Sequence, residues 1–295
     1  MCCLRLSRRP GLTVRIIVLW AFFAAAVWLQ SGGARAAASN WVTTDFSQLR
    51  LISADDFVAG RQSLSIGVQI RLEAGWKTYW RNPGDAGFPT FFDWSASQNV
   101  QKVSLAWPAP KRISFEGLDS FGYEEEVIFP AKIQLADPLS PVRIEVEVVY
   151  AVCREICFPL SAHLTLELPA LGSGQETATE VHQNMIRRFE NRVPISNNSQ
   201  LDIIEVSVNG GAGKRVLHLT VVAQESFVYP DVFVEGPADV IFGRPQIALA
   251  QDRRRACIDI PIDEGGDVTY GFETLTITLV DGDRSIEREV IPPRN

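Results

Sequence analysis

The sequence predicts an all-β fold, an antiparallel β-sandwich followed by a linking helix and a second β-sandwich. Between positions 40 and 169, short runs of alternating apolar residues are separated by proline, glycine and aspartate turns. After position 170, apolar residues recur at helical spacing. Short alternating runs return after position 200. Strands at this spacing, with turn residues between them, are typical of antiparallel sandwiches.

The first 38 residues have the pattern of a secretory signal peptide. Arginines precede an apolar run from Ile16 to Leu29, and small residues follow it. The run is shorter than the roughly 20 residues that a permanent transmembrane helix needs. We therefore expect cleavage after Ala36 or Ala38, export to the periplasm, and no stable membrane insertion of the mature chain. An uncleaved anchor is the alternative.

The charge of the mature chain argues against one class of partner. The full sequence has 28 Lys and Arg against 35 Asp and Glu, and its first 38 residues contain arginines but no acidic residue. Cleavage therefore makes the protein more acidic. An acidic surface of this kind argues against binding to nucleic acid or to an anionic membrane.

The first sandwich is expected over residues 39–170. Its alternating runs lie at 63–72, 102–107, 126–135, 143–152 and 160–169. Residues 80–94 are predicted as a loop, because Pro83 and Gly84 suit a type II turn and Pro89 interrupts any helix. The aromatic residues around this loop are interpreted as core packing and edge cover rather than as a sugar-binding platform: Trp76, Tyr79, Trp80 and Trp94.

Residues 171–199 are predicted to form a linker that contains one amphipathic helix. The apolar residues at helical spacing are Ala178, Val181, Met185, Ile186 and Phe189, and a proline ends the segment. The second sandwich is expected over 200–295, with runs at 201–208, 215–223, 231–235, 238–242, 257–262, 273–280 and 285–291. The segment GGAGKR, 210–215, is interpreted as a hairpin turn rather than a phosphate loop, because arginine follows its lysine.

Cys153 and Cys157 stand four positions apart within an apparent β-hairpin. A disulfide requires Cα atoms within roughly 7 Å, whereas four residues of extended strand span about 13 Å. If the two cysteines pair, the chain must turn tightly between them at the hairpin tip. Strand alternation places both thiols on the less apolar face of the hairpin.

Three kinds of chemistry are open to such a pair. A bridge across three residues removes little entropy from the unfolded chain, so it stabilises weakly and suits exchange better. Arg154 would favour a thiolate and Glu155 would oppose it. A structural clip is one alternative. Metal binding is another, because His163 shares the parity of Cys157 and a set of Cys153, Cys157 and His163 would suit Cu(I) in a copper-binding protein.

Three motifs resemble the N-terminal periplasmic domain of the DsbD family of thiol:disulfide interchange proteins, including its ScsB-type copper-tolerance branch. They are GWKTYWRNPGDAGFPTFFDW, LDSFGYEEEVIFPAKI and YAVCREICFPLSAHLTLELP. The resemblance covers roughly residues 40–170, and the second domain only in outline. It implies an immunoglobulin-like sandwich that takes electrons from a membrane-embedded thiol domain and passes them to thioredoxin-like periplasmic partners, without a cofactor.

The resemblance also implies roles for individual residues. Cys157 would form the mixed disulfide with a partner, and Cys153 would resolve it. A cap loop would shield the disulfide, with Phe121 as the first candidate for its aromatic residue and Tyr123 as the second. The family's membrane and thioredoxin-like domains are not found in this sequence, so we expect a module that a separate membrane-embedded donor reduces in trans.

Two further expectations concern an alternative function and the remaining cysteine of the mature chain. The competing interpretation is a non-catalytic β-sandwich interaction module with a structural disulfide. Cys257 has no cysteine near it in the sequence and is expected to be a reduced strand cysteine.

Overall fold

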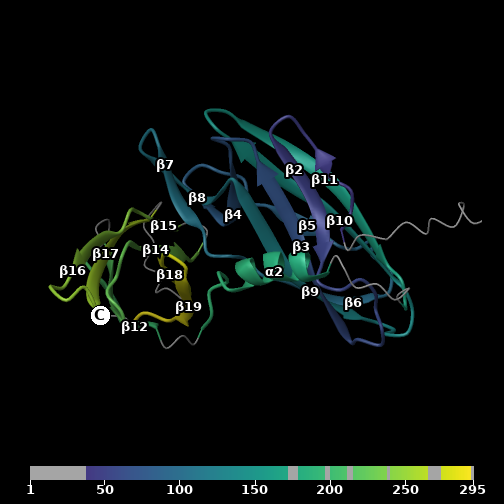
Figure 1. Cartoon of the computed structure of the whole chain (residues 1–295). Helices are drawn as coiled ribbons and strands as arrows, with labels where there is room; N and C mark the ends of the chain where they lie inside the picture. Colours follow the sequence, from purple (N-terminus) through teal and green to yellow (C-terminus); the bar gives the residue numbers. More distant parts are fainter. Residues whose placement is uncertain are drawn as a thin grey trace, which may run out of the picture. The chain divides into compact units, whose positions relative to one another are not determined.

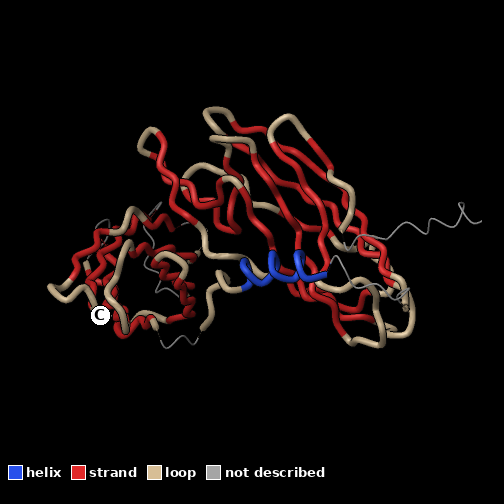
Figure 2. Tube along the Cα trace, in the orientation of Figure 1, coloured by secondary structure: helices blue, strands red, loops and turns tan. Residues whose placement is uncertain are grey.

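Antiparallel strands dominate the described residues, with one helix among them (Figures 1 and 2). The computed structural model describes residues 38–171, 179–196, 200–210, 215–237, 240–264 and 274–293. The predicted signal peptide up to residue 37, most of the linker before the helix and most of the GGAGKR turn lie outside the described residues. Within the described part of the chain, no helix has the length and apolar character needed to cross a membrane.

The first sandwich consists of two antiparallel sheets. One has the order β1-β2-β3-β9-β6, formed by Val42–Thr43, Ser47–Ser53, Ser63–Leu72, Glu126–Leu135 and Val100–Leu105. The other has the order β11-β10-β4-β8-β7, formed by Cys157–Leu168, Val142–Cys153, Lys77–Gly84, Leu118–Glu124 and Lys111–Phe115. The short strand β5, Phe91–Asp93, pairs with β10.

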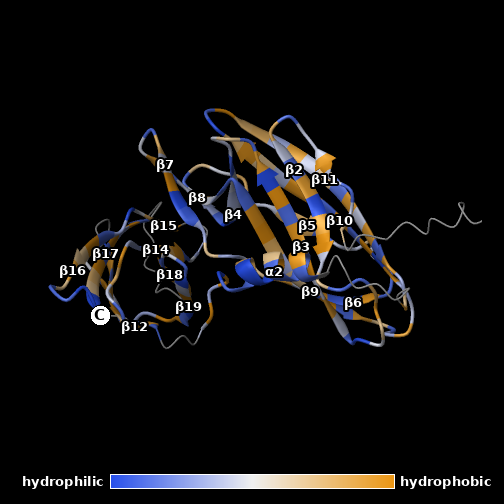
Figure 3. Cartoon of the chain, viewed as in Figure 1, coloured by the Kyte–Doolittle hydropathy of each residue, from blue (hydrophilic) through white to orange (hydrophobic). Residues whose placement is uncertain are grey.

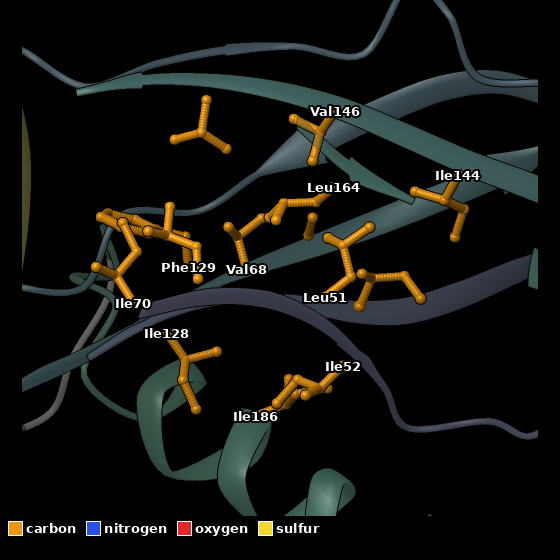
Figure 4. Packing of buried hydrophobic residues seen from close by; sticks show 14 of the residues in the cluster. Leu51, Ile52, Val68, Ile70, Ile128, Phe129, Ile144, Val146, Leu164 and Ile186 are labelled. Atoms are coloured by element: carbon orange, nitrogen blue, oxygen red, sulfur yellow. The ribbon is translucent and has the colours of Figure 1, made fainter. Parts of the chain in front are cut away.

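Alternation along these strands builds the core between the sheets. Leu51, Val68 and Phe129 come from one sheet and pack towards Ile144, Val146 and Leu164 from the other (Figure 4). Along β10 the apolar residues at every second position are buried, as the sequence predicted. Figure 3 shows the resulting mixture of apolar and polar residues along β2, β3 and β10.

The prediction of a loop over residues 80–94 is partly wrong. Strand β4 continues through Pro83 to Gly84, whose φ is +79°, and β5 follows within the same stretch. The pairing of β4 with β8 shifts in register between Tyr79 and Gly84. A bulge in the strand therefore takes up the Pro-Gly pair that would otherwise make a turn.

Helix α2, Thr179–Glu190, confirms the predicted helix and covers the outer face of the first sheet. Its buried apolar side chains are Ile186 and Phe189, whereas Val181 is exposed. Figure 4 shows Ile186 beside Ile52 and Ile128. Gly67 permits this close approach, because a Cβ atom there would lie 2.6 Å from Ile128 and 3.1 Å from Ile186.

The second sandwich again has two antiparallel sheets. One has the order β12-β13-β17-β15, with β16 also paired to β17, formed by Leu201–Asn209, Arg215–Ala223, Arg255–Glu264, Val240–Phe242 and Gln246–Leu249. The other has the order β14-β18-β19, formed by Pro230–Glu235, Leu275–Asp281 and Arg284–Val290. Its own apolar core includes Leu219, Ile258 and Ile277.

One aromatic side chain of the second sandwich belongs to the core of the first. Phe233 on β14 is 1% exposed, and its ring centroid lies 4.9 Å from that of Phe121 and 5.9 Å from that of Trp80. Nearby, Arg81 binds Glu235 with an Nη2 to Oε2 distance of 2.6 Å. The described strands thus lie within one compact unit, Ala36–Asn295, and the domain boundaries at 170 and 200 stay a prediction.

Candidate active site

The two hairpin cysteines form a disulfide at the point where the chain turns. Strand β10 ends at Cys153 and β11 begins at Cys157, and the two residues are directly paired in the strand register. Their Cα atoms are 4.2 Å apart. Between them the Arg154 N–H donates to the Ile156 carbonyl oxygen at 3.3 Å. The tight turn expected at the hairpin tip is confirmed.

The two cysteines differ sharply in exposure. Cys153 is 2% exposed and packs with Tyr79 and Ala151 in a small cluster apart from the main core. Cys157 is exposed. Alternation predicted both thiols on the face away from the main core, and Cys153 does lie there. A thiol from another protein can therefore approach the sulfur of Cys157, whereas the sulfur of Cys153 is covered.

Tyr79 provides the hydrogen-bond donor at the disulfide. Its hydroxyl donates to Cys153 Sγ at 2.7 Å and lies 3.3 Å from Cys157 Sγ. Burial raises the pKa of the Tyr79 hydroxyl, although a hydrogen bond with Ser120 lowers it in part. The hydroxyl therefore keeps its proton at neutral pH and remains a donor. The sequence pattern around Tyr79 predicted core packing and edge cover only, but a buried tyrosine hydroxyl usually has a partner.

The segment that follows β4 covers Tyr79. At Gly87 a Cβ atom would lie 2.5 Å from the tyrosine ring, so only glycine fits at this contact. The Ser120 hydroxyl donates to the carbonyl oxygen of Ala86 at 3.0 Å and so fixes the segment from the other side. This packing holds the tyrosine ring against the sulfur atoms.

Beside Cys157 lies a cluster of three aromatic rings, here called the aromatic cluster. The ring of Phe46 stacks on Trp76 at 4.1 Å and on Phe158 at 4.9 Å between centroids. Phe158, which follows Cys157 directly, is 38% exposed, and Ile156 in the turn is 68% exposed. The turn beside Cys157 therefore exposes the apolar side chain of Ile156, whereas Phe158 points to the strand face opposite to that of Cys157.

The expected cap residues, Phe121 and Tyr123, are core residues instead. Both lie on β8 and are buried in the main core, where the Tyr123 hydroxyl donates to the Pro108 carbonyl oxygen at 2.7 Å. Strand alternation gives the reason, because Ser120 and Gly122 share the face of Tyr79 and the residues between and after them point the other way. Their predicted shielding role is wrong.

The remaining candidates fall into two groups. Arg154 and Glu155 are exposed in the turn beside the disulfide. His163 is exposed opposite Glu147 and stands six residues beyond Cys157 on the continuous strand β11, about 20 Å away at the rise of a strand. That separation argues against the alternative in which His163 shares a Cu(I) ion with the two cysteines.

Two further observations concern metal binding and Cys257. Among the described residues, no group of three or more His, Cys, Asp and Glu side chains is placed to hold a metal ion. Cys257 lies exposed on β17 as a free cysteine, as expected.

Comparison with known proteins agrees with this geometry. Residues 48–169 match the family described as thiol:disulfide interchange protein DsbD, N-terminal, and residues 192–294 match a domain of unknown function, DUF8393. The crystal structure of the N-terminal periplasmic domain of ScsB from Proteus mirabilis has a similar fold, with a TM-score of 0.68 and 22% identity over 88% of this chain and 100% of that one. No curated protein matches. The all-β, immunoglobulin-like fold class is thereby confirmed.

Proposed function

We propose that this chain, whose residues 48–169 form a domain of the DsbD N-terminal type, relays reducing equivalents in the periplasm through Cys153 and Cys157. A membrane-embedded thiol protein would supply the electrons, and thioredoxin-like periplasmic proteins would receive them. One observation carries the proposal, namely that one cysteine of the disulfide is exposed while the other is buried against a hydrogen-bond donor. A purely structural bridge needs no such difference.

The first half of the relay is reduction of the disulfide. A thiolate of the donor attacks Cys157 Sγ, the bond between Cys157 and Cys153 breaks, and its electron pair stays on Cys153 Sγ. The Tyr79 hydroxyl already donates to this sulfur, so it stabilises the negative charge as it forms. A second donor thiolate then attacks the donor's sulfur in the mixed disulfide and releases Cys157. The donor becomes a disulfide and the pair becomes a dithiol.

The second half passes the same two electrons on. The Cys157 thiolate attacks the disulfide of the recipient and forms a new mixed disulfide, while the recipient's other sulfur leaves as a thiolate. Cys153 then attacks Cys157 Sγ, which re-forms the intramolecular disulfide and releases the reduced recipient. Ile156, exposed in the turn next to Cys157, would contact each partner during these steps.

Cys153→Ala and Cys157→Ala are expected to behave very differently in a mature chain whose exposed Cys257 is replaced by serine. With Ellman's disulfide as the probe, Cys157 in the first variant should react at least tenfold faster than Cys153 in the second, because a buried thiol must wait for local opening. An oxidised thioredoxin-like domain should form a stable mixed disulfide with Cys153→Ala only. Equal labelling of the two cysteines would contradict the proposal, and a wild-type disulfide that glutathione buffers leave intact would favour the structural clip.

Tyr79→Phe is expected to slow reduction of the disulfide by dithiothreitol roughly tenfold or more. The variant keeps the buried ring but removes the donor to Cys153, and hydrogen bonds to charged groups contribute about 1.5–3 kcal/mol. Rates are measured by thiol release at neutral pH. Tyr229→Phe is the matched control, because Tyr229 is 84% exposed, and its rate should equal that of wild type. An unchanged rate for Tyr79→Phe would exclude the donor role.

A further inference from the structure

A buried lysine, Lys77, lies two residues before Tyr79 on strand β4. Lys77 is 7% exposed although lysine is almost never buried without a partner. On β4 it stands directly opposite Cys153 of β10 on one side and opposite Glu124 of β8 on the other. Directly opposed residues of paired strands project to the same face of the sheet. Lys77 therefore shares the face on which the disulfide lies.

Ser120 connects this lysine to the tyrosine. Lys77 Nζ donates to Ser120 Oγ at 3.3 Å, and Ser120 also lies close enough to Tyr79 to lower the pKa of the tyrosine hydroxyl. A serine hydroxyl has one hydrogen and two lone pairs, so it can accept from the lysine while it donates elsewhere. The chain of polar groups runs from the Lys77 ammonium through Ser120 and Tyr79 to Cys153 Sγ.

We propose that Lys77 is a positioning residue that acts through Ser120 and Tyr79 to stabilise the thiolate leaving from Cys153. This inference rests on the proposed function and deepens it. When a thiolate attacks Cys157 Sγ, the electron pair of the broken bond collects on Cys153 Sγ. The Ser120 hydrogen, which now points to the Ala86 carbonyl oxygen, turns to the Tyr79 oxygen, and each donor in the chain strengthens the next.

The charges around Lys77 are consistent with this role. Glu124 faces it from β8 and is itself 4.0 Å from Nζ of the exposed Lys111. Burial lowers the pKa of the Lys77 ammonium, and Glu124 raises it in part. The site thus holds a desolvated positive charge, which gains a favourable partner when Cys153 becomes negative. The reduced state is stabilised relative to the disulfide.

Lys77→Met tests the proposal in the mature chain, with dithiothreitol as the reductant. The substitution keeps the apolar stem and removes the charge. We expect reduction to slow roughly tenfold, the effect of about one unit in the pKa of the leaving thiol, and the equilibrium with glutathione to shift towards the disulfide. Lys111→Met, which removes a charge from the other neighbour of Glu124, should stay within about twofold of wild type.

A second set of variants separates the relay from a merely structural effect. Ser120→Ala should slow reduction as much as Lys77→Met, and the double variant should be no slower than either, because both break one chain. A further test measures the rate at which iodoacetamide labels Cys153 as a function of pH, in a chain that carries Cys157→Ala. Adding Lys77→Met should raise the midpoint of this pH profile by about one unit. Lys77→Arg should restore most of the rate.

The outcomes distinguish the two proposals. If the wild-type disulfide reacts and Cys157 is the accessible thiol, but Lys77→Met and Ser120→Ala both match Lys111→Met, the role of Lys77 is overturned and the relay function stands. If Cys157 and Cys153 react alike, the relay function itself fails. Should Lys77→Met not fold, Ser120→Ala decides the question in its place, because it breaks the chain while the lysine is kept.

Discussion

Phe233→Ala is expected to lower the free energy of unfolding by about 3–5 kcal/mol, the usual cost of removing a fully buried aromatic side chain. Phe233 is 1% exposed and packs edge-on against both Phe121 and Trp80. The three rings come from strands β14, β8 and β4. Urea unfolding of the mature chain, followed by tryptophan fluorescence, measures the loss.

Tyr229→Ala supplies the control for this experiment. Tyr229 stands just before β14 and is 84% exposed, so its removal should change stability by less than about 0.5 kcal/mol. A loss below about 1 kcal/mol for Phe233→Ala would show that the ring does not belong to the core of the first sandwich. Two separate unfolding transitions in the variant would show that this contact joins the two sandwiches into one cooperative unit.

The strands that alternation predicted well are those with one face in a core. Strands β3 and β9 have the predicted bounds, 63–72 and 126–135, because every second residue is apolar along their whole length. Strand β4 was missed because local turn chemistry at Pro83 and Gly84 outweighed the alternation before it. Its Gly84 is fixed by a distant contact, since a Cβ atom there would lie 2.4 Å from the Asp119 carbonyl oxygen.

The site was predicted in part for a similar reason. Spacing and alternation depend on neighbouring residues, and they placed the cysteines at a hairpin tip on the face away from the main core. The burial of Cys153 depends on Tyr79, 74 positions earlier in the chain, and no local pattern reveals that contact. Phe121 and Tyr123 belong to the core because alternation along β8, Leu118–Glu124, points both into it, and a resemblance between motifs does not reveal this.

Asp119 is the centre of a charged cluster that joins β8 to the second sandwich. Its carboxylate is 7% exposed, and it accepts hydrogen bonds from Arg112 at 3.1 Å, from Arg244 at 3.0 Å and from Ser114 at 2.7 Å. The bond from Arg244 holds the pKa of Asp119 well below its usual range, although burial raises it; Ser114 and Arg112 lower it further. The folded protein therefore stabilises the ionised form of the Asp119 carboxylate.

Asp119→Asn is expected to lower the free energy of unfolding at pH 7 by about 3 kcal/mol, since breaking a buried ion pair leaves charges without a partner. The pKa of Asp119 is lower in the folded than in the unfolded state, where it is about 3.9. Its contribution is thus fully present above about pH 4 and is lost as the pH falls towards the folded value. The stability difference between wild type and variant should therefore shrink below about pH 4.

Urea unfolding between pH 7 and pH 3 measures this difference, with Asp283→Asn as the control. Asp283 also pairs with an arginine, Arg192 at 3.2 Å, but its side chain is 84% exposed, so its loss should cost less than about 1 kcal/mol at any pH. A gap between wild type and Asp119→Asn that stays constant down to pH 3 would mean that the charge of Asp119 does not stabilise the fold. A stability difference that disappears at low pH only for Asp119→Asn would show that this cluster makes the fold sensitive to acid. It would also show that the attachment of β8 to the second sandwich weakens when Asp119 is protonated.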